Sequence, residues 1–255
     1  QIVRSALTFF PEGESIRFLE PALGTGSFLE ALCEVVPVQP ITAIGIEIDR
    51  EFARASREIW VNHKVEVVEA DFTAVDPASF GFSANLLITN PPYVGHHHIP
   101  TEHKQHLVRL SRRVSGIQPS GLSGLYIHFM LIAQRWLAPG AVSAWLIPSE
   151  FMDVNYGSEL KQYLTQNVEL LRIHRFEPED VQFDDALVTS TVVIFRNIKP
   201  IQDHKVTYSV GGSMDSPRDS LQLSLCELKS LRKWSGVPQA TFQQETPVLT
   251  LGDAF

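Results

Sequence analysis

Short apolar runs alternate with turn signals over the first ninety residues of the chain. Four of these runs end at polar or proline-containing turns and are predicted to be buried strands: residues 16–20, 41–48, 65–68 and 84–89. A helix is predicted to begin near Ser27, between the first two runs. Helical periodicity from Glu51 to Trp60, after a possible N-cap at Asp49, predicts a second helix.

The same alternation continues to about residue 197. Helical patterns occupy residues 125–137, before Pro139-Gly140, and residues 158–166. The remaining apolar runs are 141–147, 168–176 and 187–195. Because strands this apolar must be covered on both faces, the predicted fold class is α/β, with a mostly parallel sheet and helices on both faces. Such a sheet binds ligands at the carboxyl ends of its strands.

The alternation of strand-like and helix-like patterns ends after Asn197. A glycine-rich and proline-containing stretch over 211–217 is followed by a polar tail. We therefore predict one domain over residues 1–197 and an irregular appendage over residues 198–255.

Composition narrows the class of protein. With 44% hydrophobic residues the chain can bury a core, and it has no run of about 18 apolar residues that would span a bilayer, so no membrane partner is expected. Cys33 and Cys226 have neither disulfide-framework nor zinc-site spacing, which predicts a reducing compartment, the cytoplasm. The net charge of −8 argues against a surface coated in phosphate contacts, although local basic patches can exist within it.

A glycine pair follows the first predicted strand. Gly24 and Gly26 can take positive φ and let a small molecule approach the main chain, although Leu29 stands where a dinucleotide-binding pattern needs its third glycine. A tight turn would explain the pair on its own. Glu47 follows Gly26 by 21 residues, at the end of the second strand, where a carboxylate can accept both hydroxyls of a ribose.

Asp71 and Phe72 follow the third strand, where they could present a carboxylate and a ring to an adenine, or simply form a surface loop. The sequence Asn90-Pro-Pro-Tyr93 follows the fourth strand and is the most specific signal. An exocyclic amino group is a poor nucleophile until its hydrogens are drawn to acceptors. Asn90 offers a side-chain oxygen and Pro91 a backbone carbonyl, and the two prolines hold both in a stiff geometry.

With these motifs in this order, the chain resembles a class I S-adenosylmethionine-dependent methyltransferase of the N6-adenine DNA type, found in restriction-modification systems. The resemblance covers residues 16 to 197 and implies a Rossmann-like fold with S-adenosylmethionine as cofactor. It implies the following cofactor-binding residues: Glu20, Ala22, Gly24, Gly26, Glu47, Ile48, Asp71 and Phe72. The catalytic loop it implies is Asn90, Pro91, Pro92 and Tyr93.

The resemblance also implies a partner and a way of presenting the substrate. Methyltransferases that act on duplex DNA rotate the target base out of the stack, so double-stranded DNA is the expected partner. Tyr93 and Phe183 would stack on the flipped adenine, and no metal is required. A restriction endonuclease domain or subunit is a possible further partner.

Two departures from the family pattern suggest a catalytic-domain fragment. The family has a Thr-Pro motif before the first strand, but only Phe9-Phe-Pro11 is found there. The family also has a large C-terminal target-recognition domain, and residues 198–255 would form only the start of one.

A basic segment follows the catalytic loop. The triplet His96-His-His98 lacks the spacing of a metal site and is interpreted as a border of the loop. Between Thr101 and Arg113, four cationic residues stand against one acid. The candidate DNA contacts are therefore His96, His97, Lys104, Arg109, Arg112 and Arg113. A mobile loop that orders on DNA and a solvated helix face explain the segment equally well.

Three functions are compatible with these residues. The first is methylation of N6 of adenine in double-stranded DNA. The second is methylation of another conjugated amino group, either an RNA adenine or a protein glutamine amide. The third is a catalytically silent DNA-binding module, against which the intact Asn90, Pro91 and Tyr93 argue.

Overall fold

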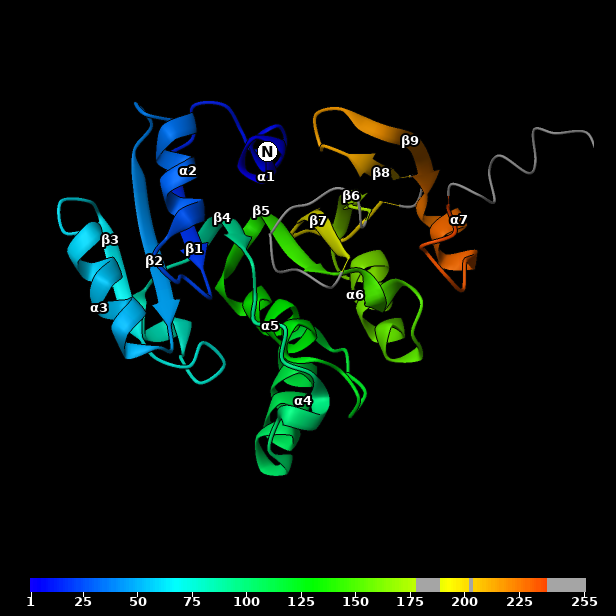
Figure 1. The fold of residues 1–255 in the computed structure, drawn as a ribbon, viewed down its shortest axis with the longest axis horizontal. Helices are drawn as coiled ribbons and strands as arrows, with labels where there is room; N and C mark the ends of the chain where they lie inside the picture. The colour runs from blue at the N-terminus through cyan, green and yellow to red at the C-terminus, as the bar shows by residue number, and fades with distance from the viewer. Residues whose placement is uncertain (178–188, 202–203, 238–255) are drawn as a thin grey trace, which may run out of the picture.

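Nine strands form one continuous sheet in the computed structural model, which describes residues 1–177, 189–201 and 204–237 (Figure 1). In chain order the strands are β1 (Ile16–Glu20), β2 (Ile41–Glu47), β3 (Val65–Glu69), β4 (Ala84–Thr89), β5 (Leu137–Pro148), β6 (Glu169–Arg175), β7 (Ser190–Arg196), β8 (Lys205–Gly212) and β9 (Pro217–Ser224). The α-helices are α1 (Ile2–Leu7), α2 (Ser27–Val35), α3 (Arg50–Ile59), α4 (Thr101–Ser115), α5 (Leu125–Ala133), α6 (Ser158–Gln166) and α7 (Leu225–Ser230).

The strand order places the first four strands around a change of direction. Across the sheet the order is β3-β2-β1-β4-β5-β7-β6-β8-β9, and five of the eight neighbouring pairs are parallel. The chain runs outward from β1 to β3 and then returns to place β4 on the other side of β1. The loops after β1 and β4 therefore diverge, which opens a crevice at the carboxyl ends of these strands. The predicted α/β class is confirmed.

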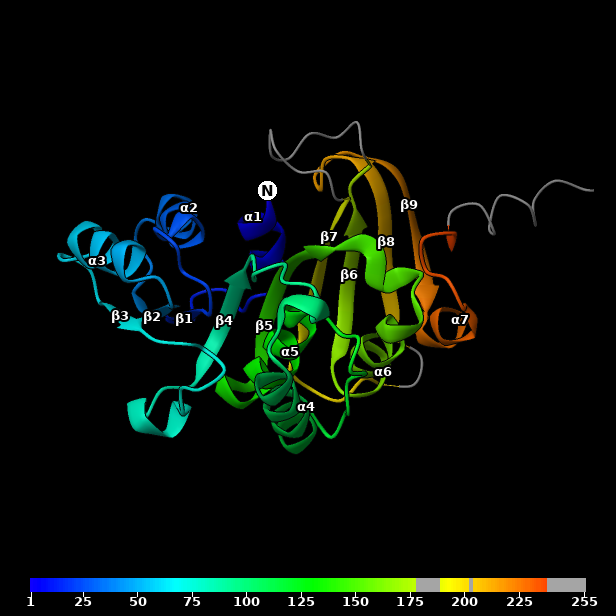
Figure 2. The same cartoon turned by 60° about the horizontal axis from the view of Figure 1, so that its bottom comes forward.

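Helices cover both faces of the sheet because its inner strands are apolar on both sides. Phe18 and Leu19 are adjacent in β1 and fully buried, yet they belong to two different core clusters. Leu29 and Leu32 of α2 pack in the cluster with Phe18, and α5 packs in the other. In Figure 2, α2 and α3 lie on one side of the sheet, and α4, α5 and α6 lie on the other.

The helix predicted over residues 125–137 is shorter in the structure. α5 ends at Ala133, and a short 3₁₀ turn leads into β5, which begins at Leu137 rather than at residue 141. The strand begins with a register shift against β4, between Ala84 and Leu86, and Gly140 there has a φ of 80°. The irregular pairing accommodates Pro139, which has no N–H for a regular ladder.

Residues 205–230 are regular, although the sequence pattern predicted irregular structure after residue 197. β8 pairs in parallel with β6, and β9 completes a hairpin at the edge of the same sheet. β9 alternates exposed and half-buried positions, so its sequence resembles a polar loop. The assignment of residues 198–255 to a target-recognition region stays a prediction, and residues 238–255 lie outside the described residues.

Tyr208 of β8 provides a test of whether this hairpin folds with the rest of the sheet. Its ring is fully buried, and its hydroxyl donates a hydrogen bond to the Trp234 carbonyl at 2.8 Å. We expect Tyr208→Ala to lower the free energy of unfolding by about 3–5 kcal/mol, as for other large core truncations. Tyr208→Phe should lower it by about 1 kcal/mol, the value of one hydrogen bond.

Urea unfolding followed by tryptophan fluorescence would measure both values. Phe18→Ala in the central strand β1 is the reference variant. Both alanine variants should shift one common unfolding transition. A Tyr208→Ala protein whose main transition stays in place would show that β8 and β9 fold apart from the rest of the sheet.

Candidate active site

A cavity of about 500 Å³ opens at the carboxyl ends of β1, β2, β3 and β4. It brings together side chains and backbone from four segments that are far apart in the sequence. Among the predicted site residues, the lining includes Ala22, Gly24, Glu47, Ile48, Asp71, Phe72, Asn90 and Pro92. Six of the eight candidate cofactor residues therefore share one crevice with Asn90 and Pro92 of the candidate catalytic loop, whereas Glu20, Gly26, Pro91 and Tyr93 are not among its lining residues.

The loop after β1 is held open by two glycines in the left-handed region. Gly24 has a φ of 55° and Gly26 a φ of 89°. Ser56 of α3 donates a hydrogen bond to the Gly24 carbonyl at 2.5 Å, and the Trp60 indole donates to the Thr25 carbonyl at 3.1 Å. A Cβ atom at Gly26 would lie 2.5 Å from the indole nitrogen of Trp60. Only glycine fits at position 26. The tight turn that it allows places the backbone of Gly24 at the cavity.

Glu47 organises the acidic side of the cavity. One carboxylate oxygen accepts the Gly24 amide and the other accepts the Asp49 amide, each at 2.8 Å. Each oxygen keeps a further lone pair for a hydroxyl donor in the cavity. Asp49 is the N-cap of α3, as predicted: its side chain accepts the amides of Glu51 and Phe52 at 2.8 and 3.1 Å.

Glu20 is a buried carboxyl next to this loop. It is 2% exposed, and its Oε2 atom has no hydrogen-bond partner among the described residues. Burial raises its pKa well above the usual value, and the nearby Glu47 charge adds to this, while a hydrogen bond from the Leu29 backbone opposes it. An unpaired buried acceptor suits a cationic ligand group, such as the ammonium of an amino acid.

Asp71 and Phe72 differ in how far they reach into the cavity. The Asp71 Oδ1 atom accepts both the amide and the hydroxyl of Thr73 at 2.8 Å, which leaves Oδ2 available. Phe72 is 2% exposed, and its ring packs against Phe129 and Trp136 at centroid distances of 5.0 and 6.1 Å. Phe72 thus forms a floor of the cavity rather than an open stacking face.

The segment Asn90 to Tyr93 leaves β4 at the other side of the crevice. In the described part of the chain, no donor forms a hydrogen bond with the Asn90 side chain or the Pro91 carbonyl. The Tyr93 hydroxyl donates to the Leu146 carbonyl of β5 at 3.0 Å, while the residue is 42% exposed. Burial raises the pKa of Tyr93 to about 12, and a hydrogen bond with Ser190 partly opposes this rise. The ring is thus anchored at one end with its face accessible.

The candidate DNA-contact residues lie next to this loop. His96 and His97 belong to a short 3₁₀ turn in which neighbouring rings contact each other. The basic segment forms the helix α4, so of the two interpretations left open by the sequence the structure agrees with the helix face and not with the loop. On α4, Arg109, Arg112 and Arg113 are exposed and Lys104 is half-buried.

Phe183, the second predicted stacking residue, lies outside the described residues.

Phe52 and His103 line the cavity and were not predicted from the sequence. Phe52 is 53% exposed, and Ile48 beside it is 71% exposed. Two apolar side chains this exposed at a cavity rim provide a surface for a planar ligand group. An exposed aromatic in the first turn after an N-cap is a signal for Phe52, whereas nothing in the sequence places His103 of α4 against the end of β3.

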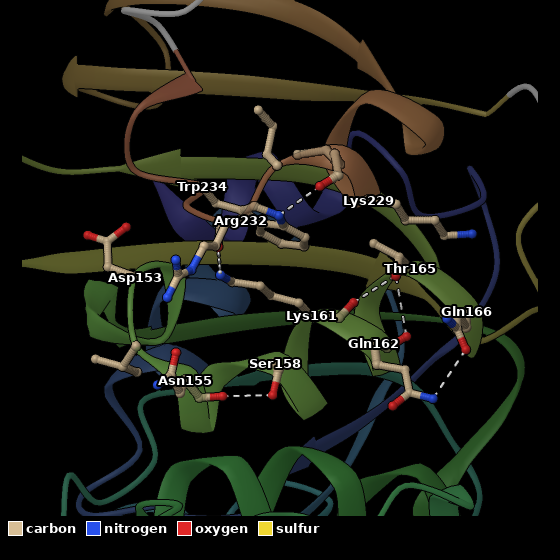
Figure 3. Close-up of a pocket in the computed structure, with 13 residues that line it drawn as sticks. Asp153, Asn155, Ser158, Lys161, Gln162, Thr165, Gln166, Lys229, Arg232 and Trp234 are labelled. Atoms are coloured by element: carbon tan, nitrogen blue, oxygen red, sulfur yellow. Dashed lines mark hydrogen bonds between the residues drawn. The ribbon is translucent and has the colours of Figure 1, made fainter.

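A second cavity of about 540 Å³ lies between α6 and the segment that runs from α7 to Trp234 (Figure 3). Its central cation is already engaged: Lys161 donates to the Met152 carbonyl and, at 2.9 Å, to the Arg232 carbonyl, and lies 5.7 Å from the Trp234 ring. These contacts join α6 to the residues after α7. The residues of the cavity at the strand ends, in contrast, leave acceptors unpaired.

The described residues contain no group of three His, Cys, Asp or Glu side chains that could hold a metal ion. Nor does any helix in this part of the chain combine the length and the apolar character needed to cross a membrane.

The sheet order and the crevice define a class I methyltransferase fold. A protein described as a class I S-adenosylmethionine-dependent methyltransferase, from Listeria monocytogenes, superposes with a TM-score of 0.68 at 14% identity, covering 85% of this chain and 64% of that one. The type IIG restriction endonuclease BpuSI superposes with a TM-score of 0.71 at 15% identity, covering 92% and 31%.

Residues 48–182 match the Eco57I restriction-modification methylase family, and the chain belongs to this family. The type II methyltransferase M.XamI of Xanthomonas campestris pv. amaranthicola is 28% identical over all of this chain. M.AccI of Acinetobacter calcoaceticus is 27% identical over 72% of it. The chain spans 49% of the first relative and 35% of the second. Fold and family together imply S-adenosylmethionine as the cofactor.

The glycine loop supplies a test of this geometry. We expect Gly26→Ala to lower the free energy of unfolding by about 2–4 kcal/mol, because its Cβ would meet the Trp60 indole in a strained backbone. Gly24→Ala should cost only about 1 kcal/mol, because its φ is strained but no atom lies within 4 Å of the added carbon.

Chemical denaturation of the two variants side by side measures this difference. The tryptophan emission of the folded protein should change in Gly26→Ala, where the Trp60 indole is displaced, and stay as in the parent in Gly24→Ala. Equal losses of stability in the two variants would contradict the close approach of Trp60 to the loop.

Proposed function

We propose that this chain is the catalytic part of an enzyme that transfers a methyl group from S-adenosylmethionine to N6 of an adenine in double-stranded DNA, within a restriction-modification system. The observation that carries the proposal is the single cavity lined by Glu47, Asp71 and Asn90. A cofactor held by the first two residues would lie next to an amino group held by the third. The type II methyltransferase names of its relatives agree with this setting.

The cofactor half of the cavity fits the parts of S-adenosylmethionine. The free lone pairs of Glu47 would accept the ribose hydroxyls, and Asp71 Oδ2 would accept the adenine amino group. Ile48 and Phe52 would cover the adenine ring. The buried Oε2 atom of Glu20, which has no hydrogen-bond partner among the described residues, would accept the ammonium of the methionine part, next to the backbone from Ala22 to Gly26.

The chemical part of the site prepares the amino group of the substrate. The bound cofactor supplies an electrophilic methyl group. Asn90 Oδ1 and the Pro91 carbonyl would accept the two N–H hydrogens of the substrate, so that the nitrogen lone pair leaves conjugation with the ring. Pro91 and Pro92 limit the motion of both acceptors, so little reorganisation is needed during the reaction.

Tyr93 would present its exposed ring to the planar base. Its hydroxyl is held by the Leu146 carbonyl, so the ring position is fixed before the base arrives. A base inside a duplex cannot reach this ring, and the target would therefore be flipped out. Phe183 is proposed for the opposite face, and a restriction endonuclease domain or subunit as the functional partner. The proposed compartment is the cytoplasm, which is where a restriction-modification system meets its DNA.

Two substitutions separate the two halves of the site. Asn90→Ala should reduce methyl transfer by about 10²–10³-fold, as when one oriented hydrogen-bonding group is removed from a catalytic site. It should leave cofactor affinity unchanged, because the proposal assigns the Asn90 amide to the amino group of the substrate and not to the cofactor. Glu47→Ala should weaken cofactor binding by about tenfold or more, because two charge-assisted hydrogen bonds to the ribose are lost.

Titration calorimetry with S-adenosylmethionine and tritiated methyl transfer to adenine-containing duplex DNA measure these effects. Glu51→Ala, an exposed acid on the same helix as Phe52, is the control for a change of charge near the cavity. Transfer to a duplex in which N6-methyladenine replaces adenine should be absent. The reverse pattern, with Asn90 controlling cofactor affinity, would contradict the assignment.

A further inference from the structure

Among the polar side chains that line the cofactor cavity, His103 has no role in the proposed function. The other four are already assigned. Glu47 and Asp71 are proposed for the cofactor, and Asn90 for the substrate, while Asp49 caps α3. His103 lies in the first turn of α4, and its side chain is 38% exposed, so a ligand in the cavity can reach the ring.

The position of the His103 ring is set by the packing of α4. His103, Leu107 and Ser111 follow each other at intervals of four residues and so share one side of the helix. Leu107 and Ser111 are fully buried, and Ser111 forms a hydrogen bond with His128 Nδ1 of α5 at 3.0 Å. The buried side of α4 therefore continues into His103, which lies at the margin of the core where the cavity opens.

Asp71 presents one carboxylate oxygen to the same space. Its Oδ1 atom accepts the amide and the hydroxyl of Thr73, each at 2.8 Å, and these two bonds fix the orientation of the carboxylate. The Oδ2 atom lies 3.8 Å from His103 Nε2. This distance allows an electrostatic contact but is too long for a hydrogen bond, so both atoms remain available to a third group.

An acceptor and a donor placed side by side match one edge of adenine. The imidazole Nε2 carries a hydrogen in the protonated ring and in one of the two neutral tautomers, so His103 can donate from this atom. The amino group of adenine donates, and the ring nitrogen N7 next to it accepts. The Asp71 oxygen on the amino group and the His103 N–H on N7 would therefore bind both atoms at once.

The separation of the two side chains favours N7 over N1, the other ring nitrogen beside the amino group. N1 is bonded to the same carbon as the amino group, whereas N7 is one atom farther along the ring system. The two hydrogen bonds of a bidentate contact run nearly parallel, so partners 3.8 Å apart suit the more widely spaced pair of atoms.

We propose that His103 binds N7 of the cofactor's adenine, beside the contact of Asp71 with the amino group. The inference rests on the proposed function and deepens it, because it adds a specificity-determining residue to the cofactor site and assigns it one atom of the ligand. A nucleobase with an oxygen in place of the amino group would be rejected, since that oxygen and the Asp71 carboxylate would both be acceptors.

The test is calorimetric titration of S-adenosylhomocysteine and of its 7-deaza analogue, in which a C–H group replaces N7. In the parent protein the analogue should bind about fivefold more weakly, near the value of one hydrogen bond. His103→Ala should weaken the binding of S-adenosylhomocysteine by about fivefold and should bind both compounds equally. His103→Gln keeps an N–H donor and should recover part of the preference.

A third compound, with two methyl groups on the adenine amino nitrogen, reports the Asp71 contact separately. The parent protein should bind it about tenfold more weakly than S-adenosylhomocysteine, because the amino group can no longer donate. His103→Ala should keep this discrimination, which a collapsed site would lose. His106→Ala, an exposed histidine on the same helix that does not line the cavity, should match the parent with all three compounds.

The outcomes separate this inference from the proposed function. A parent protein that binds none of the three compounds would overturn both. If the parent binds S-adenosylhomocysteine and the 7-deaza analogue equally, or if His103→Ala keeps the full preference, only the role of His103 is overturned. The same holds if His103→Ala also loses the discrimination against the dimethylated compound. A preference that His103 confers against a 1-deaza analogue instead would overturn the choice of N7.

Discussion

One carboxylate fixes the relation between the first two strand ends. Glu47 accepts an amide from the loop after β1 and another from the turn before α3, through its two oxygens. The glycine loop therefore cannot move independently of the second strand. Ser56 and Trp60 of the same βα unit donate to the carbonyls of Gly24 and Thr25. The loop is therefore held both through an amide and through two carbonyls. These contacts set one wall of the cavity, and the ends of β3 and β4 together with residues of α4 and α5 form the others.

The strand ends could be predicted from the sequence because their signals are local. β1 and β4 are apolar runs that stop at proline and asparagine, and β2 ends at Glu47, two residues before the N-cap Asp49. Asn90 and Glu47 were therefore predicted to lie at one edge of the sheet, and the structure places both in one cavity. Parallel strands alone account for this, because their carboxyl ends coincide wherever the strands are neighbours.

The features that could not be predicted depend on contacts between distant segments. β9 alternates exposed and half-buried positions at the sheet edge, so its pattern resembles a polar tail until β8 is placed beside β6. His103 reaches the cavity because α4 packs on α5, and this packing uses Leu107 and a buried hydrogen bond between Ser111 and His128. Neither contact has a sequence signature, since a helix with one apolar stripe can pack in several ways.

Charged residues near the cavity lie on two surfaces that the proposed function assigns to different ligands. Glu20, Glu47 and Asp71 lie on or beside the cavity, where S-adenosylmethionine would bring a sulfonium and an ammonium group. The cationic residues of α4 lie on the outside of the same region, where phosphates would pass. A negative net charge is compatible with DNA binding under this arrangement, because only the local potential within about 10 Å acts on a phosphate at ordinary ionic strength. The carboxyl groups at the cavity therefore suit a cationic cofactor, and under the proposed function α4 provides positive charge where the duplex would approach.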